Sequence, residues 1–313
     1  MTTDETDTTS PDLPLITPAP LVAEWDAKAE RIEMPLREGA IVWRKWGSGP
    51  PIVFFHGGSG SWTHWIRNIP ELSKRFTVYA IDLPGMGDSG WFSGNELDLR
   101  PGERSDFRVP LKPEWQPPPI TMPALSRRLA SDIEKLIPDG PITLVGFSFG
   151  GMTAANVTAR IPHRIGRLVL VGAAGVAERN PAMKKLATWR FASNAQELWE
   201  VQRENVGILM IHNPAKVDDL AVNIQVSNGQ RTQSRKTPRY PTTLDALRAA
   251  RPKLGAIWGR FDSISGWQID DIRKTFREID PDCPFHVVED GGHWVAFECA
   301  DEFNRALTDM MTH

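Results

Sequence analysis

Short apolar runs alternate with amphipathic segments along most of the chain. The runs that predict buried strands cover residues 41–46, 52–55, 76–81, 141–145, 168–171, 254–259 and 285–289. Between them, apolar residues at helical spacing predict helices over residues 65–73, 125–136, 152–160 and 298–311. This alternation predicts an α/β fold class, with a mostly parallel sheet and helices on both of its faces.

Two segments interrupt the alternation. Residues 93–119 are rich in Pro and charge and predict a long loop, which is either a lid or a solvated surface excursion. Residues 174–240 are more polar than the sheet segments and fall between two predicted strands. We therefore expect a helical cap there, inserted into a core made of residues 21–173 and 241–313. Candidate cap helices cover residues 184–191, 195–204 and 215–227.

Composition narrows the classes of partner. The net charge of -3 and the pI near 6.2 give no basic surplus, which argues against a nucleic-acid partner. The longest apolar run, residues 168–177, is too short to span a membrane. Residues 1–20 are rich in Thr, Asp and Pro, lack the pattern of a signal peptide and are expected to form a disordered tail.

The two cysteines, Cys283 and Cys299, cannot supply a disulfide framework or a metal-ligand cluster. We therefore expect free thiols, a cytoplasmic location, no metal and no cofactor. The expected partner is a small-molecule substrate, and the choice between a monomer and a homodimer stays open.

Residues 146–150 carry the most informative pattern, Gly-Phe-Ser-Phe-Gly between a predicted strand and a predicted helix. So tight a turn needs glycine two residues before and two residues after its centre. The turn strains Ser148 and raises its hydroxyl above the edge of the sheet, as in a nucleophile elbow. A glycine-rich turn with an incidental serine is the alternative, so the partners of Ser148 decide between the two.

A serine hydroxyl needs a base to take its proton, and the base needs an orienting carboxylate. Of the histidines after Ser148, His293 follows a strand and a short turn, at the edge of the sheet where sites form. The other histidines have plainer positions in a strand, in the cap or on the surface: His163, His212, His286 and His313. Asp262 follows another strand by three residues and is the expected acid, although a turn cap would also explain it.

Two backbone N–H groups are needed to stabilise an oxyanion. The N–H of Phe149 follows the predicted nucleophile at the start of a helix. The N–H of Gly58 lies in the glycine-rich loop after the strand of residues 52–55. We expect these two donors to form the oxyanion hole.

Together with these residues, the segments 82–89, 259–262 and 292–294 resemble the α/β-hydrolase fold over about residues 40–313. The resemblance implies a mostly parallel sheet of the eight-stranded type, an inserted cap and a catalytic triad of Ser148, Asp262 and His293. We also expect a substrate pocket beside Gly57, Phe147 and Trp294.

Residues 292–294 and 300–305 resemble more narrowly the meta-cleavage product hydrolases, which cleave carbon–carbon bonds in ring-opened aromatic acids. That family has Asn where this chain has Phe147, and its cap arginine aligns near Ile224. Arg190 is another cap cation that could take the arginine's place.

Three functions follow from these patterns. The first is a serine hydrolase acting on a small or medium apolar carboxylic ester through an acyl-enzyme. The second is a carbon–carbon hydrolase of a meta-cleavage-type dienone. The third is a non-catalytic ligand receptor on the same fold.

Overall fold

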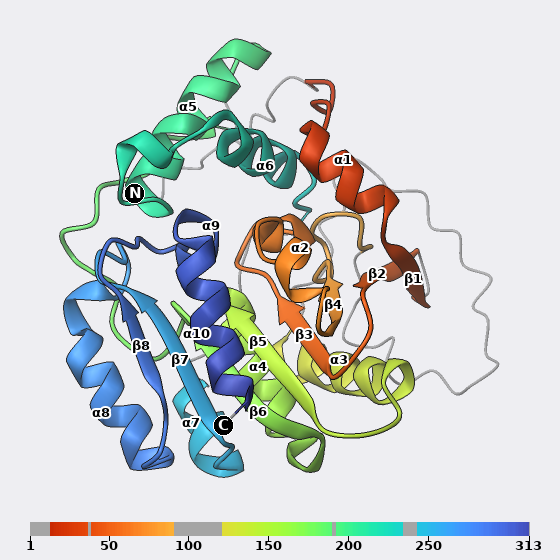
Figure 1. Cartoon of the computed structure of the whole chain (residues 1–313). Helices are drawn as coiled ribbons and strands as arrows, with labels where there is room; N and C mark the ends of the chain where they lie inside the picture. The colour runs from red at the N-terminus through yellow and green to blue at the C-terminus, as the bar shows by residue number, and fades with distance from the viewer. Residues whose placement is uncertain (1–12, 37–38, 91–120, 190–191, 234–242, 313) are drawn as a thin grey trace, which may run out of the picture.

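The computed structural model describes residues 13–36, 39–90, 121–189, 192–233 and 243–312. Within these residues, one sheet has eight strands in the order β1-β2-β4-β3-β5-β6-β7-β8 (Figure 1). β2 runs antiparallel to β1 and β4, and all other neighbouring strands are parallel, which confirms the predicted fold class. The strands are β1 (Glu30–Pro35), β2 (Ala40–Trp46), β3 (Pro51–Phe55), β4 (Thr77–Ile81), β5 (Ile142–Phe147), β6 (Ile165–Val171), β7 (Leu254–Gly259) and β8 (Phe285–Val288).

Helices cover both faces of the sheet. In β3, Val53 and Phe55 join a core with α3, α4, α7 and α8, whereas Ile52 and Phe54 join a second core with α2, α9 and α10. Burial on both faces explains why the strands are continuous apolar runs. The helices are α1 (Pro20–Ala27), α2 (Ile69–Leu72), α3 (Met122–Leu136), α4 (Phe149–Thr158), α5 (Ala195–Leu209), α6 (Asp219–Gln230), α7 (Thr243–Ala250), α8 (Ile269–Ile279), α9 (Val295–Glu298) and α10 (Ala300–Thr312).

One predicted helix is interrupted. The helix predicted over residues 65–73 is replaced by a 3-10 turn, η1 (Trp62–Trp65), and the short helix α2. Pro70 has no N–H to continue a helix from η1, and it lies in the first turn of α2, where that loss costs nothing. The predicted helix over residues 298–311 is confirmed by α10, which begins at Ala300, two residues later than predicted.

The candidate helix over residues 184–191 is wrong for its described part, residues 184–189. The side chain of Asn205 binds both backbone groups of Ala187: its Oδ1 accepts the N–H at 2.8 Å, and its Nδ2 donates to the carbonyl at 2.9 Å. These groups are therefore not available for helical hydrogen bonds. The predicted loop over residues 93–119 lies outside the described residues.

Helices α5 and α6 follow β6 in the chain and precede β7, and they lie at the top of Figure 1. With the turn η5 (Pro214–Lys216) between them, residues 195–230 are called the insert below. Ion pairs bind both ends of α6 to the rest of the molecule: Asp218 pairs with Arg67, and Arg231 pairs with Asp88. The insert is therefore fixed to the sheet domain at two separate points.

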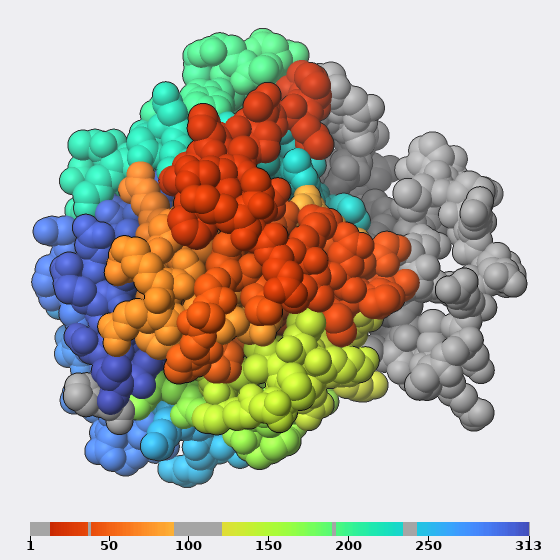
Figure 2. Space-filling view, turned by 45° about the vertical axis from the view of Figure 1, so that its right-hand side comes forward, coloured from red at the N-terminus to blue at the C-terminus, as the bar shows by residue number. Residues whose placement is uncertain are grey.

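Residues 13–19, within the segment expected to be a tail, lie along α6. The backbone N–H groups of Ile16 and Ala19 donate to the side chains of Gln230 and Asn223, at 3.0 and 2.9 Å. Figure 2 shows this N-terminal segment, in red, between the green insert and the orange residues of the sheet domain. The segment therefore connects the insert with the sheet domain.

A buried arginine organises the loop after β4. Arg44 is 2% exposed and pairs with Asp82, Asp88 and Asp26. Asp82 also accepts the backbone N–H groups of Trp62 at 2.8 Å and of Asp88 at 3.0 Å. The network therefore joins α1, β2 and the β4 loop to η1, which follows the predicted oxyanion loop.

Candidate active site

Ser148 lies at the sharp turn between β5 and α4 and has a strained backbone. Its φ is 51° and its ψ is -115°, in the left-handed half of the map that a non-glycine residue rarely occupies. A Cβ added to Gly146 would lie 2.5 Å from the carbonyl oxygen of Gly150. A Cβ added to Gly150 would lie 2.3 Å from the carbonyl oxygen of Phe55. Both glycines are therefore required by the turn, as the sequence pattern predicts.

Asp262 and His293 are brought together by the loops after β7 and β8. The His293 Nδ1 is 2.8 Å from the Asp262 Oδ2, and both residues are 3% exposed. The other carboxylate oxygen accepts the backbone N–H groups of Ile264 at 2.8 Å and Ser265 at 3.1 Å. Since a carboxylate only accepts, Nδ1 carries the proton and Nε2 keeps a lone pair, as a general base requires.

The end of β6 lies between Ser148 and the Asp262–His293 pair. The Ser148 N–H donates to the Val171 carbonyl at 2.9 Å, and the Ser148 carbonyl accepts the N–H of Ala174 at 2.9 Å. A Cβ added to Gly172, between these two residues, would lie 2.9 Å from the Asp262 Oδ2 and 3.1 Å from the His293 Nδ1. The three predicted triad residues therefore lie at the same edge of the sheet.

The predicted oxyanion donors are also close neighbours. A Cβ built on Gly58 would lie 3.8 Å from the Phe149 Cβ. Among the described residues, neither the Gly58 N–H nor the Phe149 N–H donates a hydrogen bond. Both donors are therefore available beside Ser148 to stabilise negative charge on a substrate oxygen.

Two buried histidines support the Gly57–Gly58 loop: His56, which precedes it in the glycine-rich motif, and His64, which the sequence patterns did not single out. His56 accepts the N–H of Leu83 on Nε2 at 2.8 Å, so its Nδ1 carries the proton and donates to the Gly57 carbonyl at 2.7 Å. His64 accepts the N–H of Gly57 on Nδ1 at 3.2 Å. Burial lowers the pKa of both imidazoles, and that of His64 falls well below its ordinary value. Both rings are therefore neutral where the loop needs them as acceptors.

The three residues expected in the substrate pocket differ in their surroundings. A Cβ on Gly57 would lie 3.4 Å from the Ser148 Cβ, so its backbone borders the candidate nucleophile. Phe147 is buried, and its ring centroid is 4.9 Å from that of His293. Trp294 is fully buried, its indole N–H donates to the His64 carbonyl at 2.9 Å, and its ring stacks on Phe297. We therefore assign Trp294 a packing role below the His293 loop.

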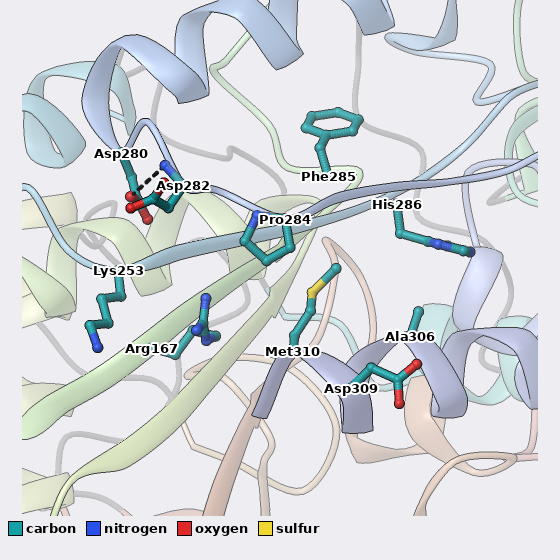
Figure 3. Close-up of a pocket in the computed structure, with 10 residues that line it drawn as sticks. All are labelled: Arg167, Lys253, Asp280, Asp282, Pro284, Phe285, His286, Ala306, Asp309 and Met310. Carbon is teal, nitrogen blue, oxygen red and sulfur yellow. Dashed lines mark hydrogen bonds between the residues drawn. The ribbon is translucent and has the colours of Figure 1, made fainter. Parts of the chain in front are cut away.

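A hollow of about 540 Å³ lies at the opposite edge of the sheet (Figure 3). Arg167, Lys253 and Pro284, which line it, lie at the amino ends of β6, β7 and β8. The candidate triad follows the carboxyl ends of β5, β7 and β8, so this hollow is separate from it. The part of the chain that the structure describes contains no cluster of side chains suited to a metal ion. Within the same residues, no helix is long and apolar enough to cross a bilayer.

We expect Gly150→Ala to lower the free energy of unfolding by about 3 kcal/mol, because the new Cβ would overlap backbone atoms that cannot move freely. Urea denaturation followed by far-UV circular dichroism measures the change. Gly207→Ala is the matched control: Gly207 is exposed within α5, and an added Cβ meets nothing closer than 4.0 Å. It should stabilise the protein by about 0.5–1 kcal/mol. Equal effects at the two positions would contradict the steric account of the turn.

Stability should decrease below pH 6.5, because the unfolded chain then protonates His56 and His64 while the folded chain keeps them neutral. Each histidine contributes a slope of about 1.4 kcal/mol per pH unit until its folded pKa is reached. Urea unfolding at pH 7.0, 6.0 and 5.0 measures how the free energy of unfolding changes with pH. In His64→Gln this slope should be smaller by the contribution of one histidine. The exposed His163→Gln is the control. An unchanged slope in His64→Gln would exclude His64 as a source.

Comparison with known proteins agrees with this geometry. Residues 50–203 match a family model described as the alpha/beta hydrolase fold. The 2-hydroxy-6-oxo-6-phenylhexa-2,4-dienoate hydrolase of Comamonas testosteroni is 24% identical over 300 residues, which is 89% of this chain and 93% of that protein.

Two solved structures show the same fold. The meta-cleavage product hydrolase CumD of Pseudomonas fluorescens IP01 has a TM-score of 0.65 at 20% identity, covering 90% of this chain and 97% of CumD. The carboxylesterase CesB of Bacillus subtilis has a TM-score of 0.67 at 16% identity, covering 93% of this chain and 94% of CesB. The chain therefore has the alpha/beta hydrolase fold and is similar to the meta-cleavage product hydrolases and related esterases.

Proposed function

We propose that the chain is a serine hydrolase that cleaves a small or medium apolar carboxylic ester. The observation that carries this proposal is the 2.8 Å contact between His293 Nδ1 and Asp262 Oδ2, at the sheet edge where Ser148 has its strained backbone. An oriented imidazole beside an exposed hydroxyl is the arrangement that activates serine for acyl transfer.

The reaction would proceed in two stages. His293 Nε2 takes the Ser148 proton as the hydroxyl oxygen attacks the ester carbonyl, and Asp262 stabilises the imidazolium that forms. The N–H groups of Gly58 and Phe149 bind the oxyanion. His293 then gives its proton to the departing alcohol, leaving an acyl group on Ser148. Water, deprotonated by His293, releases the acid and restores the hydroxyl.

The surroundings of the candidate site favour an uncharged substrate. Phe147 stands where the carbon–carbon hydrolases that the sequence resembles have an amide, and Ile224 lies near the place of their cap arginine; both residues are 1% exposed. Arg203 of the insert and Arg231, directly after it, are already paired with Asp219 and Asp88. Arg190 lies outside the described residues.

The second candidate function is carbon–carbon hydrolysis of a meta-cleavage-type dienone. The observation that favours it is the likeness to the Comamonas testosteroni dienoate hydrolase, which spans 89% of this chain. The same triad would serve this reaction, with water attack on the keto group followed by loss of a carbon leaving group. A non-catalytic ligand receptor is a weaker alternative, because a receptor does not need an oriented Asp262–His293 pair.

We further propose that residues 174–240 form a cap over the site. Asn228 of α6 accepts hydrogen bonds from the hydroxyls of Ser61 and Thr63, which follow the oxyanion loop, at 2.7 and 3.3 Å. Met210, which follows α5, accepts the backbone N–H of Trp294 beside His293 at 2.7 Å. The insert therefore contacts the loops on both sides of the candidate site. Free Cys283 and Cys299 agree with the proposed cytoplasmic location.

Ser148→Ala should lower kcat for short p-nitrophenyl esters by about 10⁴-fold or more, because the acyl-enzyme can no longer form. Initial rates over a range of ester concentrations measure the loss. The thermal unfolding midpoint of the same preparation should stay close to that of the wild type, which shows that the variant is folded. Hydrolysis at a near-wild-type rate would exclude the proposed mechanism.

The two candidate reactions differ in the substrate that is turned over fastest. We expect kcat/KM for the best member of a p-nitrophenyl ester series, from acetate to octanoate, to exceed that for a ring-fission dienone by about 10-fold or more. Absorbance assays on the same enzyme preparation measure both. The reverse order would make carbon–carbon hydrolysis the function, and turnover of neither class would favour the receptor.

A further inference from the structure

Glu298 is a buried carboxylate that the proposed reaction does not use. It is the last residue of α9 and is 4% exposed. Three backbone N–H groups converge on it. Its Oε2 accepts from Gly292 at 2.6 Å and from His212 at 3.1 Å, and its Oε1 accepts from Asn213 at 2.7 Å. Three such donors compensate for burying the carboxylate and fix its position.

The donors come from two segments that are far apart in the sequence. His212 and Asn213 follow α5 of the insert, whereas Gly292 directly precedes His293. The backbones are also in contact, because a Cβ added to Gly292 would lie 2.6 Å from the His212 nitrogen. Glu298 therefore binds the end of α5 directly to the loop that bears His293.

The loop that bears Asp262 reaches the same end of α5. The Ser263 hydroxyl donates to the Leu209 carbonyl at 2.7 Å. The ring of Phe261 stacks on that of His212, with centroids 3.7 Å apart and planes 8° apart. The neighbours of Asp262 in the chain, Phe261 and Ser263, thus contact residues 209–213. Gly292, the neighbour of His293, is joined to the same residues through Glu298.

We propose that Glu298 is a positioning residue for His293, and this inference rests on the proposed function. Its carboxylate fixes the His293 loop against the end of α5, so the alignment of His293 with Asp262 depends on how the insert is seated. Glu298 does not touch the reacting atoms. It acts through the backbone of Gly292 and couples the insert to the base of the triad.

An amide in place of this carboxylate could not satisfy the three donors. One oxygen of Glu298 would become an NH₂ group that faces at least one backbone N–H, so at least one hydrogen bond would be lost. A negative charge would also be removed near His293. A looser Asp262 contact and a lost negative charge both disfavour the imidazolium that forms on His293 during the reaction.

Glu298→Gln should therefore lower kcat by about 10- to 100-fold, with KM changed much less, because a small misplacement of a catalytic group affects the transition state most. The acidic limb of the pH profile of kcat/KM should move to lower pH, an effect that a loss of stability alone does not produce. The assay uses the best p-nitrophenyl ester, or the dienone if the wild type prefers it.

Asp219→Asn is the matched control. It makes the same carboxylate-to-amide change in the first turn of α6, where Asp219 pairs with Arg203 of α5, so both partners lie within the insert and away from the His293 loop. Its rate and its pH profile should match the wild type. A shift in this variant equal to that in Glu298→Gln would contradict a specific role for Glu298.

A Ser148→Ala sample in the same assay separates failure of this inference from failure of the proposed function. If Ser148→Ala keeps its activity, the proposed function fails. If Ser148→Ala is inactive while folded Glu298→Gln keeps the wild-type rate and pH profile, only the role of Glu298 is overturned. If Glu298→Gln does not fold, the kinetics of Glu298→Asp test the role of Glu298 instead. Its shorter side chain cannot reach all three donors, so a loss of kcat at similar KM supports the role, and wild-type kinetics overturn it.

Discussion

The candidate site depends on the close approach of backbone segments around the turn between β5 and α4. Without side chains at Gly146 and Gly150, the start of α4 packs directly against the end of β3. The same approach gives Ser148 its positive φ and brings the Phe149 N–H beside Gly58. One steric constraint therefore creates both the raised hydroxyl and the paired donors, and a side chain at either glycine would disturb both.

The polar groups below the site are buried, and their partners keep the site rigid. His56 joins the oxyanion loop to the β4 loop, and Asp82 joins the β4 loop to η1 and Arg44. A buried polar group is costly unless it is paired, so these groups are favourable only in one arrangement. The low pKa of His56 agrees with this, because a protonated ring could not accept the Leu83 N–H. The loop that carries the candidate oxyanion donor Gly58 is therefore held in place by buried hydrogen bonds.

The sequence predicted those features that depend on local pattern. The parallel strands are continuous apolar runs, and the Asp262 and His293 loops follow from the positions where two strands end. Helix α7 and the edge strand β1 were missed, since α7 has only eight residues and β1 is an edge strand without fully buried residues. The support that His64 and Glu298 give could not be predicted, because Glu298 meets His212 and Asn213 across more than eighty residues of chain. Only the folded arrangement shows such pairs.

The proposed triad does not distinguish an ester hydrolase from a carbon–carbon hydrolase, so the choice between these two functions depends on the charges around α6. A dienoate carries a carboxylate, and burying a carboxylate without a cation costs several kcal/mol. Taking Arg231 for this purpose would remove one of the cations that neutralise Asp88, which also binds Arg44 and Arg31. The new ion pair would then be gained at the expense of an existing one, with little net benefit. An uncharged ester avoids that exchange, and the charge balance around α6 therefore favours it.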